Sequence, residues 1–283
     1  MRSISTSWQH LLSLRRSLNA SIGMLMFVVV AFVAIFAPLL APYDPAALDV
    51  PNRMESPSRE HLFGTDRYGR DVFSRVIHGA RISATVGLSV VALAAFAGTF
   101  LGLIAGYFRK WDEPIMRVLD GFMAFPGILL ALAIMAALGP RLSNVIIALS
   151  IVYAPNVARV VRSCVLAIRE LDYIDAAKSI GVSDLGILVR HVLPNSMAPL
   201  IVQLTFIFAL TVLGEASLSF LGAGAPAGQP SWGNILSEGR HVIRGAPWIT
   251  IFPGIAVMFT VLSLNLLGDG LRDLLDPRLR GTR

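Results

Sequence analysis

Two lysines, Lys110 and Lys178, are the only lysines available for phosphate chemistry in this chain of 283 residues. A phosphate-binding loop needs the sequence Gly-Lys-Ser/Thr, in which the lysine reaches the phosphates of a bound nucleotide. Lys110 follows Arg109 and Lys178 follows Ala177, so neither lysine completes that motif. We therefore expect the chain to have no ATPase site of its own.

The sequence gives no evidence for a metal site or a hydrolase active site either. The five histidines are scattered, and the single cysteine, Cys164, excludes both a thiolate cage and an internal disulfide. Neither Gly-x-Ser-x-Gly nor His-Glu-x-x-His occurs in the sequence. We expect no catalytic residue, no metal and no cofactor bound by this chain, and we do not class it as an enzyme.

One segment, residues 170–200 (ELDYIDAAKSIGVSDLGILVRHVLPNSMAPL), combines mixed charge, amphipathic pattern and turn residues between two long apolar runs. Residues 173–180 have apolar positions at three-to-four spacing, which predicts a short helix. Gly181 ends this helix, and Ser183 can cap a second one that begins near Asp184.

The second predicted helix has Leu185, Leu188 and Val189 on one side, and we expect it to end before residues 193–195. Two short amphipathic helices joined by a glycine turn offer an apolar ridge that fits the groove of a partner protein. The alternative is that they lie on the chain's own bundle or on the lipid surface. The pattern by itself leaves both interpretations open.

The elements that must position this segment are long apolar runs. The chain is 55% hydrophobic and 15% charged, whereas soluble domains carry about 25% charged residues. A membrane helix needs about 20 mostly apolar residues, with roughly 17 as the minimum, and its backbone amides must be paired within the segment. We predict an all-α membrane protein with six spans, because six charge-free gaps meet this length: 17–43, 82–108, 121–140, 142–158, 191–214 and 245–268.

The basic residues lie mainly at the ends of these spans. In a soluble protein the net charge of +6 would suggest nucleic acid, but here we expect membrane lipid and no nucleic acid, since span-end charges set orientation. The flanks on one side hold fifteen Lys and Arg and those on the other hold nine, so we place both termini in the cytoplasm. The resulting division is a cytoplasmic N-terminal segment (1–21), a first span (22–41), an extracytoplasmic loop (42–81), a core of five spans (82–268) with a cytoplasmic loop (170–198), and a cytoplasmic tail (269–283).

Glu215 is an ionisable residue near the outer end of the fifth predicted span, directly after an apolar run. Such a group is costly at membrane depth and usually faces a cavity or a partner. One interpretation places Glu215 beside a translocation path, near a cation or the amino group of a peptide. The alternatives are an interfacial position, or an ion pair with an arginine of a second subunit.

Four separated motifs carry a resemblance to a known family. The first, DYIDAAKSIGVSDLGILVRHVLPN (172–195), has an acidic residue before Ala-Ala, a glycine four residues on and a later hydrophobic-Pro pair. The others are HLFGTDRYGRDVFSRVIHGARIS (61–83), GEASLSFLGAGAPAGQPSWGNIL (214–236) and GDGLRDLLDPRLR (268–280). Taken in chain order, the four motifs resemble the second permease subunit of bacterial dipeptide/oligopeptide/nickel ABC importers, and the motif at 172–195 resembles that family's EAA loop.

The resemblance implies that the cytoplasmic loop couples the chain to ATPase subunits. In the family its first short helix sits in a groove on an ATPase, whose movement would tilt the spans and switch the bundle between inward- and outward-open states. The family's leading glutamate is an aspartate here, which keeps the charge on a shorter side chain. The coupling positions carried over in this way are Asp175, Ala176, Ala177, Gly181, Leu193 and Pro194.

The resemblance also implies the partners, the location and a type I importer permease fold. The implied partners are a homologous permease in a heterodimer, two ATPase subunits that carry ATP and Mg, and an extracytoplasmic substrate-binding protein. The implied location is the bacterial cytoplasmic membrane. The binding protein would dock near residues 64–75, where charges of both signs alternate with glycines, although internal ion pairs would explain that pattern too. The candidate docking residues are Asp66, Arg67, Arg70 and Asp71.

The expected function is therefore translocation of dipeptides or oligopeptides, driven by separate ATPase subunits. Import of nickel or a nickel chelate by the same mechanism is the alternative within the family. A stand-alone channel or secondary transporter would also have six spans, but it would have no need of a structured cytoplasmic loop.

Overall fold

The computed structural model of the protein describes residues 18–226 and 228–275. Its described part is helical, with one isolated bridge between Thr65 and Asp71 and no sheet, as expected for an all-α chain. Much of the predicted N-terminal segment and tail lies outside the described residues. The elements are α2 (Leu18–Ile35), α3 (Ala37–Leu40), η1 (Val50–Asn52), α4 (Val72–Tyr107), α5 (Arg109–Met123), α6 (Gly127–Leu138), α7 (Leu142–Ile168), α8 (Asp172–Ser179), α9 (Asp184–Ile187), η2 (Leu188–Val192), α10 (Leu193–Phe220), α11 (Trp232–Gly239) and α12 (Trp248–Leu275).

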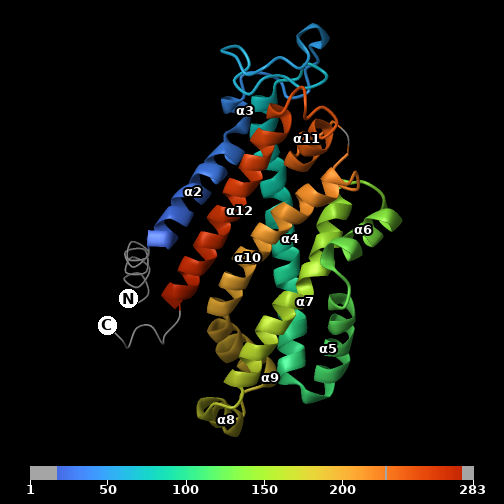
Figure 1. Cartoon of the computed structure of the whole chain (residues 1–283). Helices are drawn as coiled ribbons and strands as arrows, with labels where there is room; N and C mark the ends of the chain where they lie inside the picture. Colours follow the sequence, from blue (N-terminus) through green and yellow to red (C-terminus); the bar gives the residue numbers. More distant parts are fainter. Residues whose placement is uncertain (1–17, 227, 276–283) are drawn as a thin grey trace.

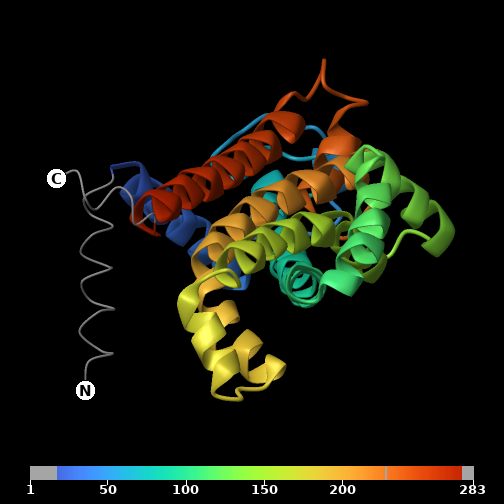
Figure 2. The same ribbon diagram turned by 90° about the horizontal axis from the view of Figure 1, so that it is seen from below.

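The long helices form a bundle with two distinct ends (Figure 1). The segment 41–71 and α11 lie at one end, which we call the loop end. The short helices α8 and α9 lie at the other, the α8 end, and Figure 2 shows them projecting from the bundle when it is viewed from that side.

Four helical runs among the described residues are long and apolar enough to cross a membrane, and the bent pair α5–α6 makes a fifth. The runs are α4, α7, α12 and the continuous stretch Asp184–Phe220, which includes α10. The first predicted span corresponds to α2, whose apolar part, Asn19–Ile35, is shorter.

The third predicted span differs most from a simple rod. Residues 121–140 fall on two helices, α5 and α6, which meet at an angle of 89°. Pro126 stands at the break with an extended ψ of 125°, and a proline also disfavours the helical conformation of the residue before it. The charge-free gap therefore indicates apolar sequence here, but not a straight helix.

Three glycines on α4 allow close packing against α7. A Cβ atom at Gly98, Gly102 or Gly106 would lie 2.5–2.8 Å from the Cβ atoms of Val157, Val161 and Val165 on α7. The four-residue spacing on both helices allows the two backbones to approach along this whole face. This contact places the end of α4 directly beside the end of α7, from which α8 follows.

Candidate coupling site

The α8–α9 element, residues 172–187, forms a helical elbow as its sequence predicts. At the end of α8, Gly181 N–H donates to the Lys178 carbonyl (2.9 Å) and Val182 N–H to the Ala177 carbonyl (3.1 Å). This pair of bonds is a Schellman motif, which needs a left-handed residue, and Gly181 supplies it with φ of +83°. The glycine thus closes the turn without strain.

The second helix begins where the sequence indicates and ends later. Ser183 caps α9 by accepting a hydrogen bond from Gly186 N–H. The prediction that the helix stops before residue 193 is wrong, because the chain runs on through the π-helical turn η2 into α10. Pro194 directly follows this π-helical turn, where the regular α-helical pattern of hydrogen bonds is already interrupted, so its missing N–H donor is tolerated.

One face of the element belongs to the protein's own core. Ile174, Ala177 and Ile187 are buried with α7 and α10 residues in one apolar cluster. Since buried side chains interdigitate without large voids, a displacement of α8 must be transmitted to α7 and α10.

The other face is exposed and apolar. Ile180 at the tip of the turn is 82% exposed and Leu185 is 71% exposed, while Tyr173 and Val189 are also exposed. The expectation that Leu185, Leu188 and Val189 share one side is wrong in part, because Leu188 is buried and the other two are exposed. An exposed apolar ridge on an ordered element is typical of a contact surface.

The six candidate coupling residues divide between these faces. Asp175, Ala176, Gly181 and Pro194 are exposed, Leu193 is half-buried, and Ala177 is buried in the core. Asp175 is paired with Lys178 (3.0 Å) on the exposed surface. The sequence pattern singled out the small residues of the turn and missed Ile180, although its place directly before Gly181 indicates the tip of the elbow.

Polar contacts tie the elbow to α4 as well. Tyr107, the last residue of α4, donates its phenolic hydrogen to Asp184 Oδ1 at 2.7 Å. Arg169, just after α7, donates from Nη1 to the Gly106 carbonyl at 2.8 Å. Both ends of the element are therefore fixed to the last turn of α4.

Two arginines of α7 hold α5 in the same way. Arg162 donates to both carboxylate oxygens of Asp112, and Arg159 to Asp120 Oδ1 at 2.7 Å. Paired charges of this kind give geometric specificity, because the bidentate contact fixes the orientation of both side chains. At the α8 end, α4, α5, α7 and the elbow thus form one connected unit.

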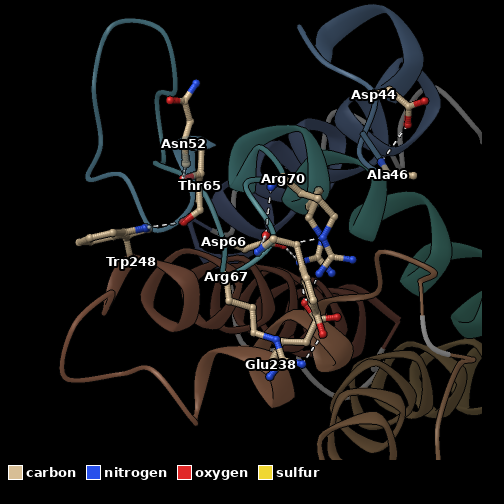
Figure 3. Close-up of polar contacts among 11 residues, drawn as sticks. Asp44, Ala46, Asn52, Thr65, Asp66, Arg67, Arg70, Glu238 and Trp248 are labelled. Atoms are coloured by element: carbon tan, nitrogen blue, oxygen red, sulfur yellow. Dashed lines mark hydrogen bonds and ion pairs between the residues drawn. The ribbon is translucent and has the colours of Figure 1, made fainter. Parts of the chain in front are cut away.

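Two of the four candidate docking residues at the loop end, Asp66 and Arg70, take part in internal ion pairs (Figure 3). Asp66 accepts from Arg70 Nε at 2.7 Å and from Arg75, and both arginines also bind Glu238 of α11. Asp66 is fully buried and the side chain of Arg75 is 1% exposed. Glu238 was not indicated by the sequence, because it lies more than 160 residues from either arginine.

Two further members of the docking set have different surroundings. Asp71 is buried, caps α4 through the Ser74 N–H and contacts His61 Nδ1 at 2.9 Å. Arg67 is exposed, and its hydrogen bond to Tyr68 raises the pKa of the guanidinium above its usual value, so it stays charged. Asp66, Arg70 and Asp71 therefore favour the alternative of internal ion pairs, and Arg67 alone presents its charge outward.

Glu215 lies in the interior of the helix bundle. It is fully buried, accepts from the Ser219 hydroxyl at 2.8 Å and lies 3.4 Å from the Ser83 hydroxyl of α4. The ion pairs recorded within residues 18–226 and 228–275 include none to Glu215. Its carboxyl group thus joins α10 to α4 through hydroxyl groups. In the described part of the chain no three metal-ligating side chains gather into a candidate metal site.

Comparison with known proteins gives two family matches. A family model described as "Binding-protein-dependent transport system inner membrane component" matches residues 98–281. A second, described as "N-terminal TM domain of oligopeptide transport permease C", matches residues 6–57. Together they cover most of the chain and leave residues 58–97 between them unmatched.

Similar proteins extend the match to nearly full length. A putative peptide transport system permease protein of Brucella suis is 50% identical over 94% of this chain and 90% of its own. The dipeptide transport system permease protein DppC of Alkalihalophilus pseudofirmus is 48% identical over 94% and 88%. The glutathione transport system permease protein GsiD of Pectobacterium atrosepticum is 42% identical over 99% and 94%.

A solved structure shares the fold. An inward-facing MetNI methionine ABC transporter matches with a TM-score of 0.61 and 18% sequence identity, over 72% of this chain and 97% of the matched one. At this identity the likeness concerns the arrangement of helices, which is that of a type I importer permease.

Proposed function

Because this chain belongs to the family of binding-protein-dependent transport system inner membrane components, we propose that it moves peptides across the cytoplasmic membrane when ATPase subunits rock its α8–α9 element. The chain is a multi-pass inner-membrane permease subunit of an ABC importer and is not an enzyme. It works with ATPase and binding-protein subunits, and the ATPase activity resides in the former.

Peptides are the proposed substrate. The relatives named above are described as peptide, dipeptide and glutathione permeases, and each covers most of this chain. This favours a peptide over nickel or a nickel chelate. We propose further that a homologous permease completes the path in a heterodimer, and that two ATPase subunits bind ATP and Mg.

The observation that carries the coupling proposal is the two-faced elbow. Its exposed face presents Ile180 and Leu185 to a partner, and its buried face is continuous with the core of α7 and α10. A groove on an ATPase subunit that takes up this ridge would move the core helices with it, as in rigid-body switching. Asp175, Ala176 and Gly181 lie on the same exposed surface and complete the contact.

The α8 end then faces the cytoplasm and the loop end faces outward. The count of basic residues in the sequence supports this orientation, since the flanks assigned to the same side as the loop 170–198 hold fifteen Lys and Arg and the opposite flanks hold nine. The binding protein would approach the loop end. There Arg67 supplies an exposed charge, while the ion pairs of Asp66, Arg70 and Asp71 hold the surface in shape.

The identity of the substrate can be tested by solute uptake in a strain that lacks the gene for this chain. We expect cells complemented with the wild-type gene to accumulate a labelled dipeptide, and cells with an empty vector to fail. Accumulation of nickel without dipeptide would overturn the peptide assignment and leave the importer mechanism standing. A matched strain without the ATPase genes separates ATP-driven import from a channel, because a channel would still admit the dipeptide.

A further inference from the structure

An apolar groove of about 500 Å³ lies near the loop end, between α2, α4 and α12. Its walls include Val29 and Val33 of α2, Ile77 and Ala80 of α4, and Ala256 of α12. These residues lie in the last two turns of α2 and in the first three turns of α4 and α12, so the groove lies at the loop-end border of the long apolar helices.

The shape of the groove follows from how α2 packs against α12. Toward the α8 end the two backbones are nearly in contact, since a Cβ atom at Gly23 would lie 2.6 Å from Leu267 N and one at Gly270 2.2 Å from Ala20 Cβ. Toward the loop end large side chains replace the glycines. There Phe63 stacks on Phe252, with ring centroids 3.8 Å apart and planes within 7°, and covers that end of the groove.

The lining offers no unused hydrogen-bonding side chain. Its one hydroxyl, on Thr260, donates to the Ala256 carbonyl at 2.8 Å. The indole nitrogen of Trp232 donates to the Val76 carbonyl at 2.9 Å. A peptide or a lipid headgroup would leave its polar groups unpaired in such a site, which excludes both on energetic grounds.

The groove opens sideways onto the lipid-facing surface. Phe32 of α2 is 51% exposed and Ile255 of α12 is 49% exposed, and both line the groove. The exposed apolar residues Leu25 and Ile35 extend the same surface along α2. The groove is therefore continuous with the face that the surrounding hydrocarbon chains contact.

From this geometry we propose that one phospholipid acyl chain, from the leaflet at the loop end, occupies the groove as a bound ligand. An apolar cavity stays dry, and its lining loses dispersion contacts as long as it is empty, so a hydrocarbon chain restores them without any polar cost. The acyl chain fills the space between α2 and α12 and supports the aromatic cover formed by Phe63 and Phe252.

Filling the groove with protein tests the proposal. Ala256→Phe places a ring in it, Ala256→Leu is a milder filling variant, and Ala92→Phe, an exposed position on α4 outside the lining, is the matched control. Native mass spectrometry of the purified importer complex counts the retained phospholipids. We expect wild type and Ala92→Phe to retain one phospholipid more than either Ala256 variant after the same detergent wash.

Equal lipid counts in all four complexes would overturn the proposal and indicate annular lipid only. Loss of the partner permease from the Ala256 variants, with the lipid count unchanged, would instead identify the groove as a protein interface.

A second measurement needs no filling variant and uses Trp232, which is 3% exposed and lines the groove. The fluorescence of Trp232 is the difference in emission between the wild-type complex and a Trp232→Phe complex. We expect phospholipids brominated on the acyl chain to quench this emission, and an unquenched Trp232 would contradict the proposal.

Discussion

The phenolic oxygen of Tyr107, at the end of α4, lies 2.7 Å from Oδ1 of Asp184, the first residue of α9. The two residues are 77 positions apart in the sequence. The contact joins the proposed coupling element to α4, a helix that is not adjacent to it in the chain. Movement of the elbow therefore reaches α4 directly, as well as α7 and α10.

Removal of this hydroxyl should weaken coupling without unfolding the protein. A hydrogen bond contributes about 0.5–1.5 kcal/mol, so we expect Tyr107→Phe to lower transport per ATP hydrolysed roughly two- to tenfold. The measurement is the ratio of peptide uptake to ATPase activity in the reconstituted complex. Tyr43→Phe, which removes a phenolic hydrogen bond at the loop end, is the control.

A double-mutant cycle with Asp184→Asn checks that the two side chains act on each other. If they do, the double variant is no worse than the more impaired single one. Additive losses would mean that the contact does not transmit the movement.

Gly181 and Gly139 form a matched pair of turn glycines. Both have positive φ (+83° and +86°), and a Cβ at either would meet nothing within 4 Å. Alanine at either position should cost roughly 1–2 kcal/mol of stability from left-handed strain. Only Gly181→Ala should also uncouple ATPase activity from uptake, because Gly139 lies in the turn between α6 and α7, away from the elbow. Equal coupling in the two variants, measured in proteoliposomes, would argue against the assignment of Gly181.

Ile180 should contribute most of the apolar contact with the ATPase. Burial of a side chain of this size stabilises a complex by about 1.5–3 kcal/mol, so we expect Ile180→Ser to weaken the binding of the ATPase subunit at least tenfold. Ile243→Ser, at an exposed position of the loop end, is the control. The check is co-purification followed by a binding titration, and unchanged affinity for Ile180→Ser would rule out the ridge as the contact surface.

The sequence was sufficient for the helical class, for the glycine turn at Gly181 and for the Ser183 cap, since these depend on local residue types. It was insufficient for contacts between residues that are far apart in the chain. The Glu238 ion pairs and the Tyr107–Asp184 contact join segments far apart in the chain, and no local pattern marks them. The alternating charges at Asp66 and Arg70 also fit two interpretations equally well, a docking surface and an internal network of ion pairs. Only the fold determines which of these charges are buried.

Glu238 should stabilise the loop end. In Glu238→Gln the two arginines keep only Asp66 as a carboxylate partner, and we expect a loss of roughly 2 kcal/mol, as for a hydrogen bond to a charged group. A thermal unfolding series and limited proteolysis of the segment 41–71 would detect it. Glu60→Gln, at an exposed position of the same segment, should behave like wild type.

Substitutions of Glu215 distinguish a structural link between α10 and α4 from a place on the translocation path. Glu215→Gln keeps an oxygen that accepts from Ser219, so as a structural link between α10 and α4 it should preserve both stability and transport. Glu215→Ala leaves the buried hydroxyl groups without an acceptor and should cost about 1–3 kcal/mol. A stable Glu215→Gln complex without transport would instead place the carboxylate on the translocation path.

The most direct test of the central claim is dipeptide uptake into proteoliposomes that contain either this chain with its partner subunits or this chain alone. We predict ATP-dependent uptake by the complete complex in the presence of the binding protein, and none by the isolated chain. Uptake by the isolated chain at a comparable rate would contradict the account, because a permease moved by ATPase subunits through its α8–α9 element cannot transport without them.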